Sequence, residues 1–150
     1  MKKIIAILFL LPLLTTITGC TTNNGDIGPL MGQWKLYEID IDGIPDANYP
    51  GNIFWQFQSH VMSMRRTNQY HDQQSRFGSW AMLTDDIMEV NFTHTDNKSP
   101  ESDYRYTPFQ ETMLPRAIFQ LNILTLNSST LIVTYFDESD RLITYRLVKW

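Results

Sequence analysis

Three histidines are the residues best suited to hold a metal ion, and their spacing argues against a site. His60, His71 and His94 are the only histidines among 150 residues, and they do not cluster. Metal sites built from protein ligands usually show close spacing such as His-x₃-His. The sequence therefore predicts no metal and no cofactor, with His60 in a turn, His71 in a loop and His94 at a strand end.

Carboxylates and serines could carry acid–base or nucleophilic catalysis, but none stands in a recognisable arrangement. Asp85 and Asp86 fall in a turn, where backbone capping explains them. Ser59 and Ser63 lie near His60 without the pattern of a catalytic triad. We therefore expect that the protein is not an enzyme.

The clustered positive charge consists of Arg65, Arg66 and Arg76. On neighbouring strands these residues could bind a carboxylate or a phosphate, because a guanidinium donates charge-assisted hydrogen bonds to both. The alternative, which the sequence favours, is that they are solvated strand ends.

Cys20 is the only cysteine, so an intramolecular disulfide is impossible. It follows a basic start at residues 1–3, an apolar run at residues 4–14 and a group of small residues. These are the parts of a secretory signal. The run has eleven residues, whereas a membrane-spanning helix needs about 20.

The sequence Ile17-Thr18-Gly19-Cys20 resembles the lipobox of bacterial lipoproteins. The resemblance implies diacylglycerol on the Cys20 sulfur, cleavage before Cys20, and acylation of the new amino group by a chain such as palmitate. Two or more lipid chains anchor a protein stably. Thr21 stands where an aspartate would retain an enterobacterial lipoprotein at the inner membrane. The expected location is the cell envelope, on the outer membrane and facing the periplasm.

Removal of the predicted signal peptide, residues 1–19, leaves 131 of the 150 residues, enough for one domain. Two of the 12 basic residues leave with it, so ten basic and 16 acidic residues give a net charge of −6. An acidic domain is a poor partner for nucleic acid. Residues 20–30 are polar and turn-rich, which predicts a lipidated cysteine with a flexible tether before a domain at 31–150.

Eight short β-type runs, separated by turn signals, fill this domain. The polar residues 67–75 favour a loop or a ragged strand edge. Residues 95–117 form the longest irregular segment, which could contain a short helix around 110–114. Eight strands without an amphipathic helix predict an all-β fold, an eight-stranded antiparallel up-and-down barrel. An open β-sandwich is the alternative. The expected strands are 34–41, 53–58, 61–66, 77–83, 87–93, 118–124, 131–136 and 142–149.

The first of these strands changes phase. Trp34 and Leu36 share one face, whereas Ile39 and Ile41 share the other. A β-bulge near residues 37–38 would bring both pairs to one face and would bend the strand as barrel closure requires.

Three short motifs resemble those of lipocalins and of small lipocalin-like lipoproteins common in Bacteroidetes. They are Gly32-x-Trp34, Gly78-Ser79-Trp80 and the paired final strands, 131–135 and 141–149. The resemblance implies a lipocalin-like barrel over residues 30–150, with Gly32 and Trp34 at one barrel end. It also implies an arginine over the Trp34 ring, and Arg146 is the candidate, with Arg141 as an alternative.

Large side chains on the predicted strands could fill the barrel or bind a ligand. Aromatic rings can close an interior or stack on an apolar molecule, and methionine can fill a core or form a pliable cavity wall. Both interpretations remain open. The predicted ligand-binding residues are Trp55, Phe57, Met64, Trp80, Met82, Tyr135 and Tyr145.

Two functions follow from these alternatives. A membrane-anchored barrel could bind a small apolar or amphipathic molecule, which requires a pocket of about 300 Å³ or more. A filled barrel could instead be a non-catalytic interaction or accessory module of an envelope assembly, which requires an exposed apolar patch for a protein partner.

Overall fold

The protein is described by a computed structural model that covers residues 28–94 and 103–150. The predicted signal peptide, Cys20 and most of the predicted tether lie outside these residues. In the described part, one antiparallel sheet has the order β2-β1-β3-β4-β5-β6-β7-β8-β9. Its strands are β1 (Gly32–Ile41), β2 (Ile44–Pro45), β3 (Ile53–Gln58), β4 (Val61–Thr67), β5 (Gln73–Met82), β6 (Ile87–Asn91), β7 (Ile118–Leu126), β8 (Thr130–Phe136) and β9 (Leu142–Lys149).

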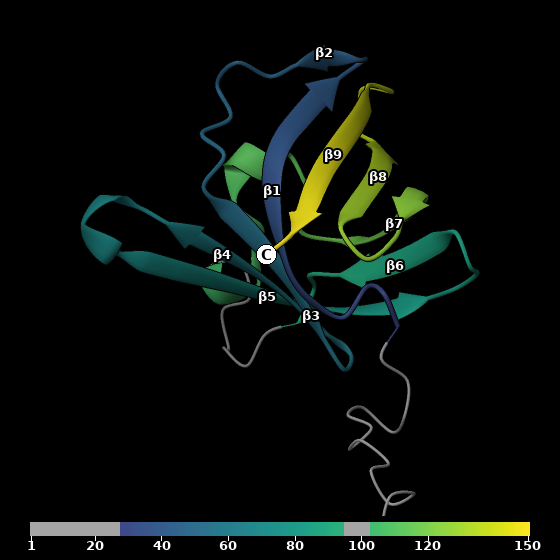
Figure 1. The fold of residues 1–150 in the computed structure, drawn as a ribbon, viewed down its shortest axis with the longest axis horizontal. Helices are drawn as coiled ribbons and strands as arrows, with labels where there is room; N and C mark the ends of the chain where they lie inside the picture. The colour runs from purple at the N-terminus through teal and green to yellow at the C-terminus, as the bar shows by residue number, and fades with distance from the viewer. Residues whose placement is uncertain (1–27, 95–102) are drawn as a thin grey trace, which may run out of the picture.

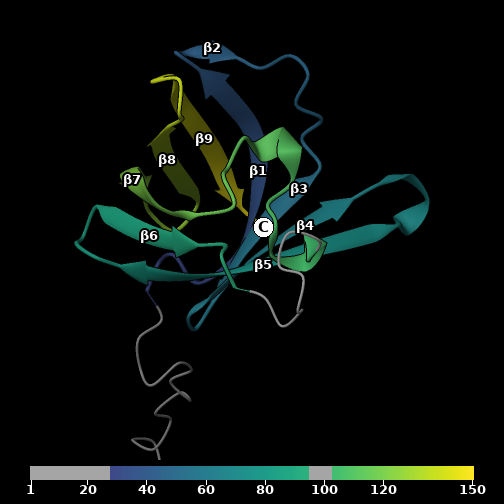
Figure 2. The ribbon, with the colours of Figure 1, turned by 180° about the vertical axis from the view of Figure 1, so that it is seen from behind.

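The sheet closes on itself because β1 pairs with β9 as well as with β3 (Figures 1 and 2). The two-residue strand β2 pairs only with the end of β1, so the barrel itself has eight strands. This confirms the predicted all-β antiparallel barrel, and the β1–β9 pairing rules out the open sandwich.

Alternating side chains fill the barrel. In β3 the buried residues Ile53, Trp55 and Phe57 alternate with more exposed ones, because successive side chains of a strand point to opposite faces.

A tight turn lies at the Asp42-Gly43 dipeptide, where the sequence predicts one. Asp42 and Gly43 have positive φ angles of 52° and 81° between β1 and β2, as a two-residue hairpin turn of this kind requires.

The predicted bulge in β1 is confirmed. Leu36 pairs with Leu147 and Glu38 pairs with Arg146, so Tyr37 is the extra residue. Tyr49 supports the bulge because its hydroxyl donates a hydrogen bond to the Leu36 carbonyl at 2.9 Å.

The prediction of a loop or ragged edge at residues 67–75 holds for 68–72 but is wrong for Thr67 and for 73–75, which lie in strands. β5 begins at Gln73, and the β4–β5 hairpin extends as a long arm with the 3₁₀ turn η3 (Gln69–His71) at its tip (Figure 1). Arg66 pairs with Gln74 and Thr67 with Gln73 in the ladder. Cross-strand backbone hydrogen bonds therefore hold a polar sequence in a strand, where composition alone favours a loop.

Residues 103–117, called the capping segment below, cover one end of the barrel. They contain the 3₁₀ turns η5 (Tyr104–Tyr106) and η6 (Gln110–Thr112), the latter where a short helix was predicted. Phe109 and Leu114 are buried against the core, and the Tyr145 hydroxyl donates to the Thr112 carbonyl at 2.8 Å. Among the described residues, no helix is long and apolar enough to cross a membrane.

Candidate functional site

Four of the seven predicted ligand-binding residues lie in the packed core. Trp55, Met64 and Tyr145 have no exposed surface, and Phe57 is 1 % exposed. The Trp55 and Tyr145 rings meet with centroids 5.2 Å apart. Protein atoms occupy the space around these side chains, so they act as core residues here, and their role in ligand binding stays a prediction.

The other three predicted residues line surface clefts at opposite ends of the barrel. Trp80 and Met82 line a cleft of about 380 Å³, together with Leu30, Met31 and Leu126. Tyr135 lines a cleft of about 310 Å³ beside the capping segment. Tyr135 therefore lies in a different cleft from Trp80 and Met82, although the Trp80 ring contacts Phe57 of the core with centroids 5.5 Å apart.

Trp34 closes the first of these ends, called the Trp34 end. Its ring is fully buried, and its indole N–H donates to the Leu30 carbonyl at 2.7 Å. The Lys149 ammonium lies 4.2 Å from the ring centroid and donates to the carbonyls of Pro29 and Met31. The Trp34 indole N–H and the Lys149 ammonium therefore both have hydrogen-bond partners.

The prediction that Arg146 packs over Trp34 is wrong, and so is the alternative, Arg141. Lys149 supplies the cation. Arg146 instead binds Asp40 and Glu38, at 2.9 and 3.2 Å, and Arg141 binds Asp137 at 2.6 Å. The physical reason is the two-residue period of a strand: Lys149 shares the inner face of β9 with Tyr145 and Leu147, whereas Arg146 points outward.

The opposite end, called the Arg76 end, carries charge on the inner face of the barrel. The inward row of β4 continues from Met62 and Met64 to Arg66, and that of β5 holds Gln74, Arg76 and the buried Gly78. Arg65 lies on the outer face, so the predicted cluster of three arginines is split. Arg66 and Arg76 line a cleft of about 570 Å³, the arginine cleft, with Tyr104, Thr107, Pro108, Phe109, Gln110 and Glu111.

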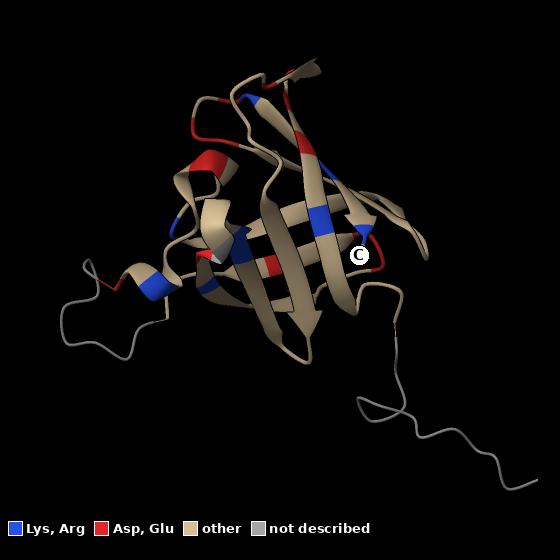
Figure 3. Cartoon of the chain, turned by 60° about the vertical axis from the view of Figure 1, so that its left-hand side comes forward, with Lys and Arg blue, Asp and Glu red and all other residues tan. Residues whose placement is uncertain are grey.

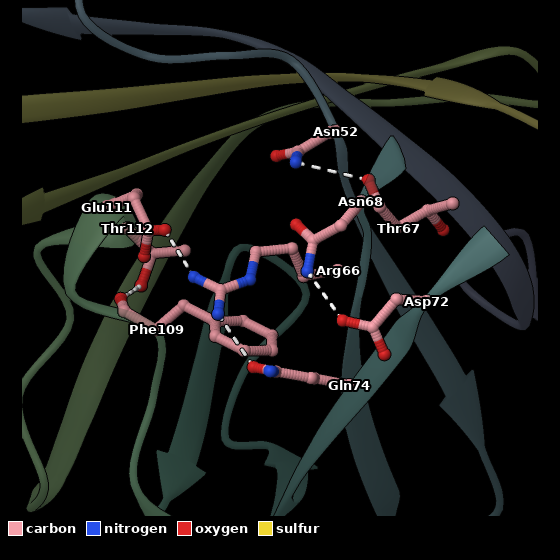
Figure 4. A network of polar contacts seen from close by, with 9 residues as sticks. All are labelled: Asn52, Arg66, Thr67, Asn68, Asp72, Gln74, Phe109, Glu111 and Thr112. Atoms are coloured by element: carbon pink, nitrogen blue, oxygen red, sulfur yellow. Dashed lines mark hydrogen bonds and ion pairs between the residues drawn. The ribbon is translucent and has the colours of Figure 1, made fainter. Parts of the chain in front are cut away.

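Arg66 is held by three neighbours, as Figure 4 shows. Its guanidinium donates to Glu111 Oε1 at 2.5 Å and to Gln74 Oε1 at 2.6 Å. The same guanidinium lies 4.7 Å from the centroid of the Phe109 ring. The charge of Arg66 is therefore paired with a carboxylate of the protein, while its Nε has no hydrogen-bond partner among the described residues.

Arg76 is held differently. Its guanidinium lies 4.7 Å from the Phe109 ring centroid and 4.9 Å from that of Tyr104. Among the described residues it has no carboxylate partner, and its one hydrogen bond is a long one, 3.5 Å, to the Ser75 carbonyl. Burial lowers the pKa of Arg76, and the nearby charge of Arg66 lowers it further.

The described residues of the arginine cleft therefore include two guanidinium groups and one carboxylate. Figure 3 shows that charged residues are sparse along the strands, so this is a local concentration of charge. Aromatic rings and Pro108 supply apolar surface beside it. Such a site can bind an anionic group and an apolar body at the same time.

Comparison with known proteins agrees with this architecture. The sequence model of the lipocalin-like domain family matches residues 14–144. The chain belongs to this family. This lipocalin-like chain is also similar to solved structures of two Bacteroides proteins. A comparison with curated proteins found no match.

The first similar structure is a lipocalin-like protein from Bacteroides uniformis, with a TM-score of 0.58 and 16 % identity. The alignment covers 82 % of the present chain and 100 % of the other. The second is an uncharacterised protein from Bacteroides eggerthii, with a TM-score of 0.60, 17 % identity, and coverage of 81 % and 99 %. At these identities the similarity shows the fold alone.

The three histidines of the lipocalin-like domain lie on different segments. His60 lies in the β3–β4 turn, and the His94 ring nitrogen lies 3.1 Å from the Ser79 hydroxyl. His71 lies in η3, and its side chain is outside the described part of the structure. Within that part, no group of three metal-ligating side chains comes together.

The sequence did not identify Phe109, Glu111 and Tyr104 as parts of a site. They lie in the segment predicted to be irregular, which has no periodicity to assign a face to any residue. The available signal was the pair of apolar residues Phe109 and Leu114 on either side of a polar turn, which is consistent with a segment that packs at both ends.

Proposed function

We propose that this lipocalin-like protein is a lipid-anchored envelope protein that binds a small amphipathic anion in the arginine cleft. The observation that carries the proposal is Arg76: a partly buried guanidinium, stacked between two aromatic rings and without a carboxylate partner in the described residues. A desolvated cation is costly unless it is paired, so an anionic ligand gains more here than at an exposed arginine.

The shape of the cleft supports the same class of ligand. Its volume of about 570 Å³ lies within the usual range for small-molecule sites, about 300–1,000 Å³. Phe109 and Pro108 offer apolar contact next to the charge. Because the barrel core is packed, the ligand binds at the mouth of the barrel and not in its centre.

A matched pair of ligands tests the binding. Isothermal titration calorimetry would compare octanoate with 1-octanol, which share an apolar chain and differ in the carboxylate. We expect octanoate to bind more tightly, and Arg76→Gln to weaken octanoate binding about tenfold, or about 1.4 kcal/mol, while leaving 1-octanol unchanged. Arg65→Gln, one residue from Arg66 but on the outer face, is the control. Equal binding of both ligands would contradict the proposal.

The lipid anchor rests on the sequence of residues 4–20. The variant Cys20→Ala removes the sulfur that would carry diacylglycerol. We expect to find the wild-type protein in the membrane fraction, from which only detergent releases it. We expect the variant not to incorporate radioactive palmitate. Palmitate label that persists in the variant would exclude Cys20 as the lipid site. Protease treatment of intact cells tests the outer-membrane, periplasm-facing location, since a periplasmic domain would be protected.

A second candidate function is favoured by the packed core. Ile118, Leu124 and Phe136, on the neighbouring strands β7 and β8, are between 56 % and 64 % exposed. A filled barrel with apolar residues on its wall suits a non-catalytic module of an envelope assembly. Absence of octanoate binding to wild-type protein would favour this alternative.

A further inference from the structure

Four residues form a cation–aromatic patch on the outer wall of the barrel, called the Trp150 patch: Lys35, Phe54, Arg65 and Trp150. Lys35 pairs with Phe54 across β1 and β3, and Phe54 pairs with Arg65 across β3 and β4, so these three form a row. The Trp150 ring packs edge-on against Phe54 with centroids 5.3 Å apart.

The cations of this patch lie over the rings. The Lys35 ammonium is 5.6 Å from the Trp150 ring centroid, and the Arg65 guanidinium is 5.6 Å from that of Phe54. Trp150 is 70 % exposed, whereas Trp34 and Trp55 have no exposed surface. A large exposed ring is costly in water unless another surface covers it.

Toward the Trp34 end, the neighbouring outward row carries no acidic residue; on the other side, the next outward pair across β1 and β9 is Glu38 with Arg146, and these two form an ion pair. The next row toward the Trp34 end consists of Gln33, Gln56, Ser63 and Phe77, joined by strand pairing. The patch is thus locally cationic on a domain whose mature sequence is acidic. Tryptophan is enriched at the headgroup level of bilayers, and lysine and arginine can extend along apolar surface toward lipid phosphates.

The patch lies beside the point where the chain enters the barrel. The Trp150 amide donates to the Gln33 carbonyl at 2.9 Å, and the Lys149 ammonium donates to the Pro29 carbonyl at 3.2 Å. Gly28 is eight residues after Cys20, and a fully extended chain spans at most about 3.6 Å per residue. A lipid on Cys20 would therefore hold this part of the domain within about 29 Å of its bilayer.

We propose that the Trp150 patch contacts the phospholipid bilayer that holds the anchor, with Trp150 and Phe54 at the headgroup level and Lys35 and Arg65 at lipid phosphates. This inference rests on the lipid anchor of the proposed function. The contact fixes the orientation of the domain on the membrane and leaves the arginine cleft, at the other end of the barrel, open to its ligand.

Quenching of tryptophan fluorescence tests the contact. The mature lipoprotein is reconstituted into vesicles of phosphatidylethanolamine and phosphatidylglycerol, with or without bromine on the acyl chains. We expect brominated lipid to quench the emission of the wild type and Trp150→Phe to lose most of that quenching, because Trp34 and Trp55 are fully buried and Trp80 is partly buried. We expect Arg65→Glu to reduce the quenching and Arg116→Glu, the same charge change in the capping segment, to leave it unchanged.

Flotation of the same vesicles separates the two proposals. Protein that floats with the vesicles while Trp150 is unquenched would overturn the membrane contact and keep the anchor. Protein that does not float would overturn both. Unquenched Trp150 together with concentration-dependent dimers would assign the patch to a second copy of the chain and would likewise overturn the membrane contact.

Discussion

The two ends of the barrel use the same interaction, a cation over an aromatic ring, with different results. At the Trp34 end, Lys149 lies over Trp34 and also donates to two backbone carbonyls. At the Arg76 end, Arg66 and Arg76 both lie over Phe109, but within the described part of the chain only Arg66 has a carboxylate partner. Among the described residues, the cation of the first end has hydrogen-bond partners, whereas Arg76 at the second end forms no ion pair with a carboxylate.

This difference indicates that the Trp34 end contributes to the stability of the fold, whereas the Arg76 end is suited to binding a ligand. A buried ring whose polar atoms all have partners contributes to folding and leaves nothing for a ligand. A stacked cation without a counter-charge contributes little to folding, because its desolvation offsets its attraction to the rings. The guanidinium of such a cation remains available to bind an anionic ligand. The following predictions test this division, beginning with the largest effect.

Removal of an aromatic ring at each end should have unequal consequences. We expect Trp34→Ala to lower the free energy of unfolding by about 3–5 kcal/mol, because it leaves a cavity in the core. Tyr104→Ala should change it by less than about 0.5 kcal/mol, since Tyr104 is 64 % exposed. Denaturation by guanidinium chloride measures both, and equal losses would contradict the proposed division.

High pH should destabilise the protein through its buried tyrosines. Burial raises the pKa of Tyr145, which anchors the capping segment, and also that of Tyr49. Above pH 10 the unfolded state loses protons that the folded state keeps, so the free energy of unfolding falls by about 1.4 kcal/mol per pH unit for each tyrosine.

The variant Tyr145→Phe isolates one of these groups. It should be about 1 kcal/mol less stable at pH 7 because the hydrogen bond to Thr112 is lost. Its loss of stability above pH 10 should be less steep than that of the wild type. Urea denaturation at several pH values measures the slope, and an unchanged slope would show that Tyr145 does not contribute to it.

The two arginines of the cleft should differ in their effect on folding. Arg66→Met leaves Glu111 and Gln74 without their partner, so we expect a loss of about 1–2 kcal/mol in the free energy of unfolding. Arg76→Met removes a like charge from beside Arg66 and should be neutral within about 0.5 kcal/mol. Thermal unfolding of both variants, compared with octanoate binding, tests whether Arg76 serves the ligand and not the fold.

Lys149→Met tests the cation at the Trp34 end. Methionine keeps the apolar contact with Trp34 but removes the charge and the hydrogen bonds to the Pro29 and Met31 carbonyls, so we expect a loss of about 1–2 kcal/mol in the free energy of unfolding. Octanoate binding should be unchanged, because Lys149 lies at the other end of the barrel. Calorimetry of the variant provides the check, and weaker octanoate binding would mean that the two ends are coupled.

The sequence by itself determined the barrel. Alternating apolar residues in β3, the Asp42-Gly43 turn and the change of phase between Leu36 and Ile39 each report a local backbone conformation, and all three predictions are confirmed. Local patterns suffice here because the period of a strand and the geometry of a tight turn depend on neighbouring residues alone.

The tertiary structure decided what the ends of the barrel do. The strand pairing placed Lys149, and not Arg146, over Trp34, and it separated Arg65 from Arg66 and Arg76. The capping segment, which has no periodicity, brought Phe109 and Glu111 to those arginines. Whether a guanidinium is solvated, paired or left to a ligand depends on groups distant in the chain, so only the folded protein shows it.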